Sequence, residues 1–396
     1  MLLESFFMVA GSLLMVATAP GIIELAFLTL GGIMPMRLSD TRSPADFPPL
    51  HFCVVVPAHD EGSGIAACVG SLLRCETAQH QLSIVVIADN CTDDTAQHAQ
   101  AAGARVIVRH DTLHRGKGQA LSFAFDKLLR ENHDVFVVVD ADTRVKPNLI
   151  QAMAPLFAAG ADAVQCRYLA SNPEASLRTR LMHVAWLAYN ILRLRGREFW
   201  GCSVGILGNG FALSRKALQA LPFEADSIAE DLDYQIRFVE SGRRVRFCNG
   251  TTVLAPAPST GSVASAQRAR WEGGRLRMMR ERLPSLLAGV ARGQLRLIEP
   301  AFDLMLLPLA FQVLLLIALV LLPWGPTRFM GLLGLAVVGM HIAAALVIGR
   351  AGWRDWLALA GAPFYILWKL TLGKRLFAAA AKDAAWVRTE RTDTDE

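Results

Sequence analysis

The sequence has no C-x-x-C pair, although its 396 residues include seven cysteines. Closely spaced cysteine pairs are typical of zinc sites and redox motifs, so this absence argues against both. Several of the cysteines fall in predicted strands or helices. We therefore expect buried, reduced thiols in a cytoplasmic domain, and no disulfide framework.

A strong net charge is also missing, since the formal charge is only +5. The arginines gather between residues 167 and 197 and again between 268 and 296, next to apolar stretches. This placement is typical of the positive side of a membrane protein and disfavours a nucleic-acid partner. Hydrophobic residues make up 53% of the chain, and the mean hydropathy is +0.34. Because the apolar excess lies at the two ends, we predict a membrane protein with a soluble middle.

No basic residue precedes the first apolar run, which argues against a secretory signal peptide. Residues 1–36 contain only two charges, Glu4 and Glu24, and are long enough to span a bilayer. Two arginines follow, which places the next part of the chain in the cytoplasm. Residues 37–50 contain three prolines and are predicted to form a linker.

Residues 51–260 alternate between β-branched runs and helical stretches, which predicts an α/β domain with a parallel sheet and right-handed crossovers. The predicted strands are 52–56, 84–88, 106–108, 135–139 and 163–168. The predicted helices are 64–74, 92–102, 117–129, 176–195 and 231–241. A glycine-rich stretch at 62–67 imitates a dinucleotide fingerprint, but five residues separate it from the preceding strand. We therefore disfavour hydride chemistry.

The carboxyl-terminal part is predicted to meet the membrane in several ways. Residues 261–300 should form interfacial helices, and 301–372 should form membrane segments. Within the latter, 302–322 and 329–348 are predicted spans. We expect 353–372 to be re-entrant or interfacial, because a third crossing would put the basic tail, 373–396, outside the cytoplasm.

Two carboxylates follow the buried run Val135–Val139, at Asp140 and Asp142. Residues two apart on a strand face the same side, and the carboxyl edge of an open α/β sheet is where ligands bind. Paired carboxylates suit a hard divalent cation, and such a cation suits a diphosphate. The alternative is a strand-end aspartate that caps a turn beside a solvated one.

Six motifs in order resemble the family 2 glycosyltransferases, which have the GT-A nucleotide-sugar fold. They are Val54–Glu61, Ile87–Thr95, Arg115–Leu121, Asp140–Asp142, Ala229–Asp233 and Gln267–Trp271. The last matches the Q-x-x-R-W signature of membrane-bound synthases of cellulose, chitin, hyaluronan and poly-N-acetylglucosamine. The resemblance covers about residues 52–271 and the flanking spans.

The resemblance implies a nucleotide-sugar donor and a divalent metal, Mg²⁺ or Mn²⁺. Asp142 would bind the metal, and Asp140 would hold the ribose or assist at the metal. The other residues expected to bind the donor are Pro57, Glu61, Asp89, Lys117 and Arg270. Asp89 would face the uracil edge, unless it forms only a turn with Asn90. Lys117 begins a helix and would bind phosphate, unless it is merely solvated.

Asp231, paired with Glu230, is the predicted general base, which implies inversion at the anomeric carbon. The alternative is a helix cap. Asn209, Gln267 and Trp271 are predicted to contact the acceptor. For Trp271 the alternative is a place in an aromatic belt at the membrane surface.

These expectations describe an inverting hexosyltransferase that acts on a membrane lipid, lipid-linked oligosaccharide or polysaccharide. It would lie in a bacterial inner membrane as a multi-pass protein. The alternatives are a processive polysaccharide synthase, which would need a partner subunit for translocation, and a non-catalytic nucleotide-sugar-binding protein. The few predicted spans favour single addition.

Overall fold

The computed structural model describes residues 2–36, 48–224, 229–258 and 261–370. Side chains at 2, 3, 261–264, 266, 268–270, 369 and 370 lie outside this description. The predicted tail, 373–396, and most of the predicted linker, 37–50, are also outside it. The chain forms two compact units. The sheet unit comprises Met36–Pro173 and Ser203–Ala257, and the helical unit comprises Met1–Pro35, Glu174–Cys202 and Pro258–Glu396.

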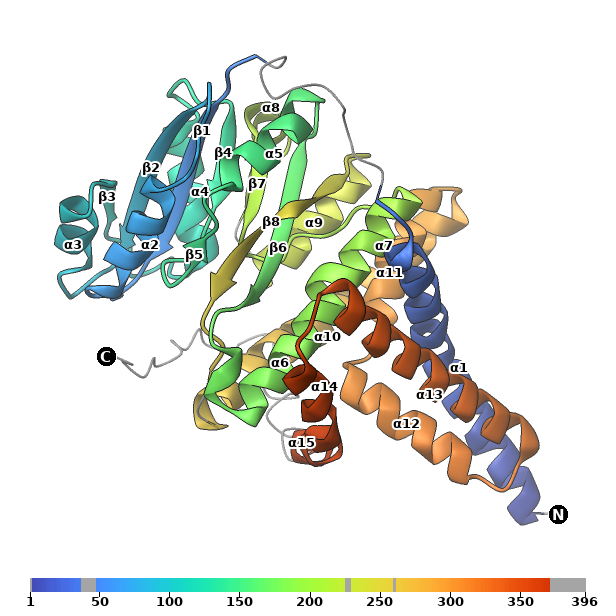
Figure 1. Cartoon of the computed structure of the whole chain (residues 1–396). Coiled ribbons are helices and arrows are strands. Elements are labelled where there is room, and N and C mark those ends of the chain that lie inside the picture. The colour runs from blue at the N-terminus through green and yellow to red at the C-terminus, as the bar shows by residue number, and fades with distance from the viewer. Residues whose placement is uncertain (1, 37–47, 225–228, 259–260, 371–396) are drawn as a thin grey trace. The chain divides into compact units, whose positions relative to one another are not determined.

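The sheet unit is built on an eight-stranded sheet in the order β3-β2-β1-β4-β7-β6-β8-β5 (Figure 1). The strands are β1 (His51–Ala58), β2 (Gln81–Asp89), β3 (Arg105–Arg109), β4 (Val135–Val138), β5 (Arg144–Val145), β6 (Ala163–Ala170), β7 (Phe211–Ser214) and β8 (Val245–Ala255). The first four pair in parallel, as predicted. However, β7 runs antiparallel to β4 and β6, and β5 runs antiparallel to β8. The sheet is therefore mixed, and the prediction of a parallel sheet holds for only part of it.

Helices pack on this sheet because its central strands are apolar on both faces. All four residues of β4 are buried, as are Phe52–Val56 of β1. The main core joins these strands to helices α2 (Gly64–Leu73) and α5 (Leu149–Ala158). The other helices of this unit are α3 (Thr95–Ala101), α4 (Lys117–Leu128), α8 (Arg215–Ala220) and α9 (Glu230–Glu240). The structure confirms the predicted helices here and adds α5 and α8. All seven cysteines are free, and five are buried.

Gly210 precedes the strand β7, which lies between β4 and β6 in the sheet. Its φ is +67°, and a Cβ at this position would lie 2.6 Å from Val253 Cγ2 and 2.7 Å from Cys166 Sγ. We expect Gly210→Ala to lower the free energy of unfolding by about 1–3 kcal/mol, because both overpacking and backbone strain result. Denaturant titration in detergent would measure this. Gly250→Ala is the control, since its Cβ would meet only Ala152 Cβ at 3.6 Å. Equal effects of the two substitutions would contradict the prediction.

Among the described residues of the helical unit, two helices are long and apolar enough to cross a membrane, Glu4–Ile33 and Gly325–Ile348. They belong to α1 (Leu2–Ile33) and α13 (Gly325–Ile348). The predicted span 302–322 is instead divided between α11 (Ile298–Met305) and α12 (Leu309–Leu321). The apolar pair made of Leu295–Met305 and Leu309–Leu321 is bent by 78°. Pro308 explains the break, because its missing N–H and rigid ring disfavour a continuous helix.

The remaining helices of this unit are shorter or more polar. They are α6 (Leu177–Leu187), the π-helical turn Ala188–Leu192, α7 (Arg193–Trp200), α10 (Gly261–Ala291), α14 (Trp353–Ala358) and α15 (Ala362–Leu370). Within the described residues, α14 has six residues and α15 has nine, and the interfacial or re-entrant character of this segment remains a prediction.

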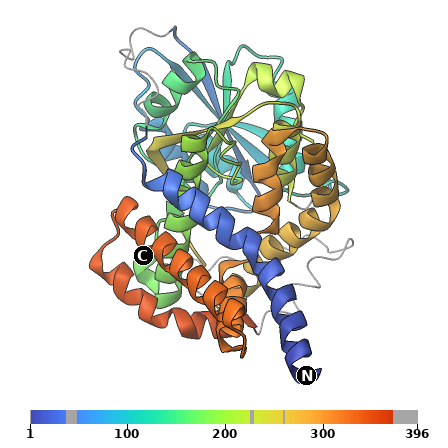
Figure 2. The same ribbon diagram turned by 90° about the vertical axis from the view of Figure 1, so that its right-hand side faces the viewer.

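Polar side chains connect the apolar helices α1, α12 and α13. The amino-terminal helix lies alongside α13 in Figures 1 and 2. Thr29 Oγ1 lies 2.7 Å from His341 Nδ1, and Gln312 Nε2 donates to the carbonyl of Thr18 at 2.9 Å. Because lipid offers no hydrogen-bond partner, such pairs orient helices against one another.

A buried ion network joins four helices of the helical unit. It contains three arginines and three acids: Arg193, Arg197, Arg275, Glu24, Glu299 and Asp303. The Asp303 carboxylate accepts hydrogen bonds from all three arginines, two from α7 and one from α10. Glu24 of α1 lies 3.8 Å from Arg197. The charges balance, which is the condition for burying so many of them.

Candidate active site

Four predicted site residues of the sheet unit lie at or just beyond the carboxyl ends of parallel strands. Pro57 lies near the end of β1 and Glu61 just after it, Asp89 is the last residue of β2, and Asp140 follows β4. The loops after β1 and β2 are tied together: the backbone N–H of Glu61 donates to Thr95 Oγ1 at 2.8 Å. The sheet thus brings these residues to one edge, as the sequence predicts.

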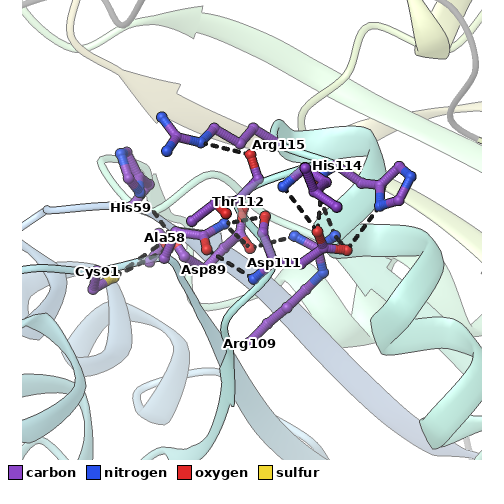
Figure 3. A network of polar contacts seen from close by, with 11 residues as sticks. Ala58, His59, Asp89, Cys91, Arg109, Asp111, Thr112, His114 and Arg115 are labelled. Atoms are coloured by element: carbon purple, nitrogen blue, oxygen red, sulfur yellow. Dashed lines mark hydrogen bonds and ion pairs between the residues drawn. The ribbon is translucent and has the colours of Figure 1, made fainter.

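Asp89 is buried and held in place by a network of polar contacts (Figure 3). Its Oδ1 accepts from Arg109 at 2.6 Å and from the Asn90 amide at 3.0 Å. Arg109 also reaches Asp111 at 3.1 Å, and the backbone N–H of Asp111 donates to Asn90 Oδ1 at 2.8 Å. The Asp89 and Arg109 side chains are only 8% and 6% exposed. These contacts fix the orientation of the Asp89 carboxylate. The local contact with Asn90, given above as the alternative role of Asp89, is present as well.

Asn209 supports the loop that carries Asp140 and Asp142, the D-x-D loop, through two hydrogen bonds. The Asn209 side chain accepts from the backbone N–H of Asp140 at 3.1 Å and donates to Thr143 Oγ1 at 2.8 Å. Asn209 is 1% exposed. Its amide is thus committed to the D-x-D loop. The structure gives the predicted acceptor contact of Asn209 no support, and we propose a supporting role for it instead.

The two acids of the D-x-D loop influence each other strongly. Burial, together with the neighbouring charge of Asp140, raises the pKa of Asp142 to about 7, although Lys117 acts against this. The pKa of Tyr168 is also raised, first by burial and then by the charges of Asp140 and Asp142. A site where carboxylates destabilise one another is one that a cation would stabilise.

Lys117 connects the D-x-D loop to the loop that carries Gly208. Its ammonium donates to Asp140 Oδ1 and to the carbonyl oxygen of Gly208. Burial opposes the charge of Lys117, but Asp140, Glu230 and Asp231 outweigh this effect and raise its pKa. A Cβ placed on Gly208 would lie 3.0 Å from Asp231 Oδ2 and 3.8 Å from Lys117 Nζ. The Lys117 ammonium and the Asp231 carboxylate therefore both lie beside Gly208, and Lys117 also contacts Asp140.

Asp231 lies in the first turn of α9, where its Oδ1 accepts from the backbone N–H of Leu232 at 2.8 Å. Burial raises the pKa of Asp231, and the nearby charge of Asp140 adds to this, whereas the Leu232 hydrogen bond and Lys117 oppose it. A buried carboxylate with a raised pKa is a stronger base than a solvated one. The hydrogen bond from Leu232 uses only Oδ1, so it is compatible with a catalytic role for Asp231.

The residues present fit a divalent cation. Asp140 and Asp142 offer only oxygen ligands, which Mg²⁺ and Mn²⁺ prefer. Their mutual repulsion and the raised pKa of Asp142 are the electrostatic features of a cation site. Asp60, Cys91 and Asp93 form a second cluster, but the Asp60 and Asp93 carboxylates already accept bonds from Thr92 and Thr95.

The Q-x-x-R-W residues belong to the other unit. Gln267, Arg270 and Trp271 lie on α10, and the Arg270 side chain is outside the description. The Trp271 side chain is 43% exposed. The predicted contact of Arg270 with the diphosphate and those of Gln267 and Trp271 with the acceptor remain predictions.

Arg109 and Thr143 are site-supporting residues that the sequence analysis missed. Arg109 ends β3 and is the register partner of Asp89 in the parallel ladder. Opposite charges at the ends of two consecutive predicted strands were a usable signal for this pair. Thr143 gave no comparable signal, because its contact with Asn209 joins residues 66 positions apart.

A model of the family described as glycosyltransferase-like family 2 matches residues 48–274, more than half of the chain. "Probable glycosyltransferase YdaM" of Bacillus subtilis is 26% identical over 230 residues, which is 56% of this chain and 54% of that protein. The beta-monoglucosyldiacylglycerol synthase of Synechocystis is 27% identical over 248 residues, 61% of this chain and 50% of that protein. The chain thus spans about half the length of these curated relatives.

Among solved structures, the mannosyltransferase PcManGT from Pyrobaculum calidifontis, in complex with GDP-Man and Mn²⁺, has a similar fold. The TM-score is 0.51 at 16% identity, and the match covers 93% of this chain and 97% of that one. The mixed sheet with its acids at one edge and the family match lead to the same conclusion. The chain belongs to glycosyltransferase family 2 and has the mixed α/β GT-A fold of nucleotide-sugar-dependent enzymes.

Proposed function

We propose that this enzyme transfers a hexose from a UDP-sugar to a membrane-associated acceptor, with inversion of the anomeric configuration. The observation that carries the proposal is that Lys117 contacts Asp140 and lies, with Asp231, beside Gly208, near the carboxyl ends of the parallel strands. A cationic group beside acids, one of which, Asp231, has a pKa raised by burial, suits a reaction that releases a diphosphate and removes a proton.

Each residue of this set has a separate task in the proposed reaction. Asp89, held by Arg109, would accept a hydrogen bond from the uracil, and Glu61 and Pro57 would line the nucleotide. Asp140 and Asp142 would hold Mg²⁺ or Mn²⁺, which when bound would neutralise the charge developing on the diphosphate. Lys117 would contact the same diphosphate, and the contact of Arg270 with it stays a prediction from the sequence.

Asp231 would take the proton of the acceptor hydroxyl as that oxygen attacks the anomeric carbon. Attack on the face opposite the diphosphate inverts the configuration and gives a β-linkage from an α-linked donor. Glu230, the first residue of α9, adds negative charge beside the base and acts on Lys117. This charge would help keep the Lys117 ammonium close to the donor.

The acceptor we propose is a lipid that receives a single sugar. Two helices are candidates for membrane spans, or three if the bent pair is one span. A processive synthase would need more helices around a polar channel, or a partner subunit. A relative named as a glucolipid synthase adds support for a lipid acceptor. We further propose that the sheet unit lies in the cytoplasm and the helical unit in the bacterial inner membrane.

The function can be tested with full-length protein purified in detergent. A panel of UDP-sugars is supplied with Mn²⁺ or Mg²⁺, and UDP release is measured with and without extracted lipids. Lipid-dependent UDP release, with one sugar added to a lipid, supports the proposal. A polymeric product would favour the synthase alternative, and UDP-sugar binding with no turnover would favour a non-catalytic protein.

Replacing Asp142 with alanine tests the metal site. We expect the affinity for UDP in the presence of Mn²⁺ to fall by about 10–100-fold, because the ion that bridges protein and diphosphate loses a ligand. Isothermal titration with UDP, with and without Mn²⁺, measures this. Asp126→Ala, on the exposed side of α4, is the control and should leave both affinities unchanged. An unchanged Mn²⁺-dependent affinity in Asp142→Ala would contradict the metal assignment.

A further inference from the structure

The ammonium of Lys117 takes up part of the predicted metal site. It donates to Oδ1 of Asp140, one of the two predicted metal-binding carboxylates, and to the carbonyl oxygen of Gly208. The Lys117 and Asp140 side chains are 29% and 28% exposed, so water screens this pair only in part. Lys117 thus acts as the positive charge among several acids that would otherwise repel one another.

A divalent ion bound at Asp140 would lie close to this ammonium, which contacts Oδ1 of the same carboxylate. Two positive charges within about 4 Å of each other repel by several kcal/mol in a partly buried site. The Lys117 contact also occupies Oδ1, one of the two oxygens of the Asp140 carboxylate. Metal binding at Asp140 therefore requires Lys117 to leave this oxygen or to lengthen its contact.

The side chain of Lys117 has a natural second partner in the proposed reaction. It extends from the first residue of α4, after Gly116, whose φ is +116°. The free backbone N–H groups of that first turn favour an anion, and the Lys117 side chain is long and flexible. A donor diphosphate bound near this turn would compete with Asp140 for the ammonium.

We propose that Lys117 is a positioning residue that serves as an internal counter-ion for Asp140 until the donor arrives, so that metal binds well only together with the diphosphate. This inference rests on the proposed function, because it assumes that Asp140 contributes to a metal site. The proposal implies an order of binding. Metal alone binds weakly, and the nucleotide diphosphate draws Lys117 away and so frees the Asp140 carboxylate for the metal. Premature metal binding is thereby limited.

The test is Mn²⁺ binding to full-length protein in detergent without nucleotide, followed by electron paramagnetic resonance. Lys117→Met removes the charge and keeps the chain length. We expect Mn²⁺ alone to bind Lys117→Met about tenfold more tightly than the wild type. We also expect the increase in Mn²⁺ affinity caused by UDP to become smaller in the variant, as reciprocal coupling requires.

Lys127→Met is the matched control, since Lys127 is exposed on the same helix, ten residues or about 15 Å away. It should leave both Mn²⁺ affinities unchanged. Equal or weaker binding of Mn²⁺ alone by a folded Lys117→Met would overturn the proposal. Absence of Mn²⁺ binding to the wild type even with UDP would instead refute the metal site itself, and the two failures are therefore distinct.

Lys117→Gln is a second neutral variant, and we expect it also to bind Mn²⁺ alone more tightly than the wild type does. If neither variant folds in metal-free buffer, recovery of the fold on adding Mn²⁺ supports the counter-ion role, because the metal then replaces the missing charge. Failure to recover contradicts it. Thermal unfolding followed by circular dichroism distinguishes these outcomes.

Discussion

Asp231→Asn is expected to lower kcat by about 10²–10⁴-fold while leaving the affinity for UDP nearly unchanged. The amide keeps the size of the side chain and can still accept from the backbone N–H of Leu232, so the helix beginning is preserved. It cannot accept a proton from the acceptor hydroxyl. The measurements are initial rates of UDP release with acceptor present, and titration of UDP binding.

A matched control is available at the other end of the same helix. Glu240→Gln also removes one negative charge from α9, but nine residues, or about 13.5 Å, from Asp231. Its rate should stay within about twofold of the wild type. If Asp231→Asn weakens UDP binding as much as it slows turnover, Asp231 organises the donor site and the assignment as base is wrong.

Asp303→Asn is expected to lower the free energy of unfolding of the helical unit by about 3–5 kcal/mol. The substitution leaves three buried arginines with two carboxylates, and all three arginines lose hydrogen bonds to a charged acceptor. The loss is large because the network is buried: Arg193, Arg197 and Asp303 side chains are 3%, 3% and 4% exposed. Unfolding in mixed micelles, followed by circular dichroism, measures it.

An exposed ion pair on α10 supplies the comparison. Arg277 and Glu281 lie one helical turn apart, at 2.9 Å, and the Glu281 side chain is 39% exposed. Glu281→Gln should cost no more than about 0.5 kcal/mol, since water and salt screen such pairs. Equal stability of the Asp303→Asn and Glu281→Gln variants would show that the buried ion network contributes little to the fold.

The predicted positions of most strands and helices in the sheet unit agree with the structure, because periodicity and strand-end residues are local signals. Val135–Val139 is an apolar run that can only be a buried element, and the acids after it must lie where that element ends. The strands β5, β7 and β8 were not predicted, and β7 shows why a short strand is difficult to predict. Phe211–Ser214 has four residues, too few to show a period, and its direction depends on pairing with β4 and β6.

Asn209 illustrates a second limit. A polar residue between two glycines near a predicted site is compatible with ligand binding, and the sequence offers nothing against it. The structure commits its amide to the backbone of Asp140 and to Thr143, so we assign it to the support of the D-x-D loop. Similarly, the apolar run 302–322 is predicted as one span. The structure divides it at Pro308 between α11 and α12, and these two helices lie at an angle to each other.

The sequence by itself therefore determined the class of fold, the family, and which acids stand at the carboxyl ends of strands, because each follows from residues within a few positions of one another. Only the tertiary structure decided that Lys117 neutralises Asp140, that Arg109 holds Asp89, and that Asp303 receives three arginines. These contacts join residues 20 to 110 positions apart. The packing that buries these charges decides which of them pair. Burial makes an unpaired charge costly and leaves a single satisfactory partner.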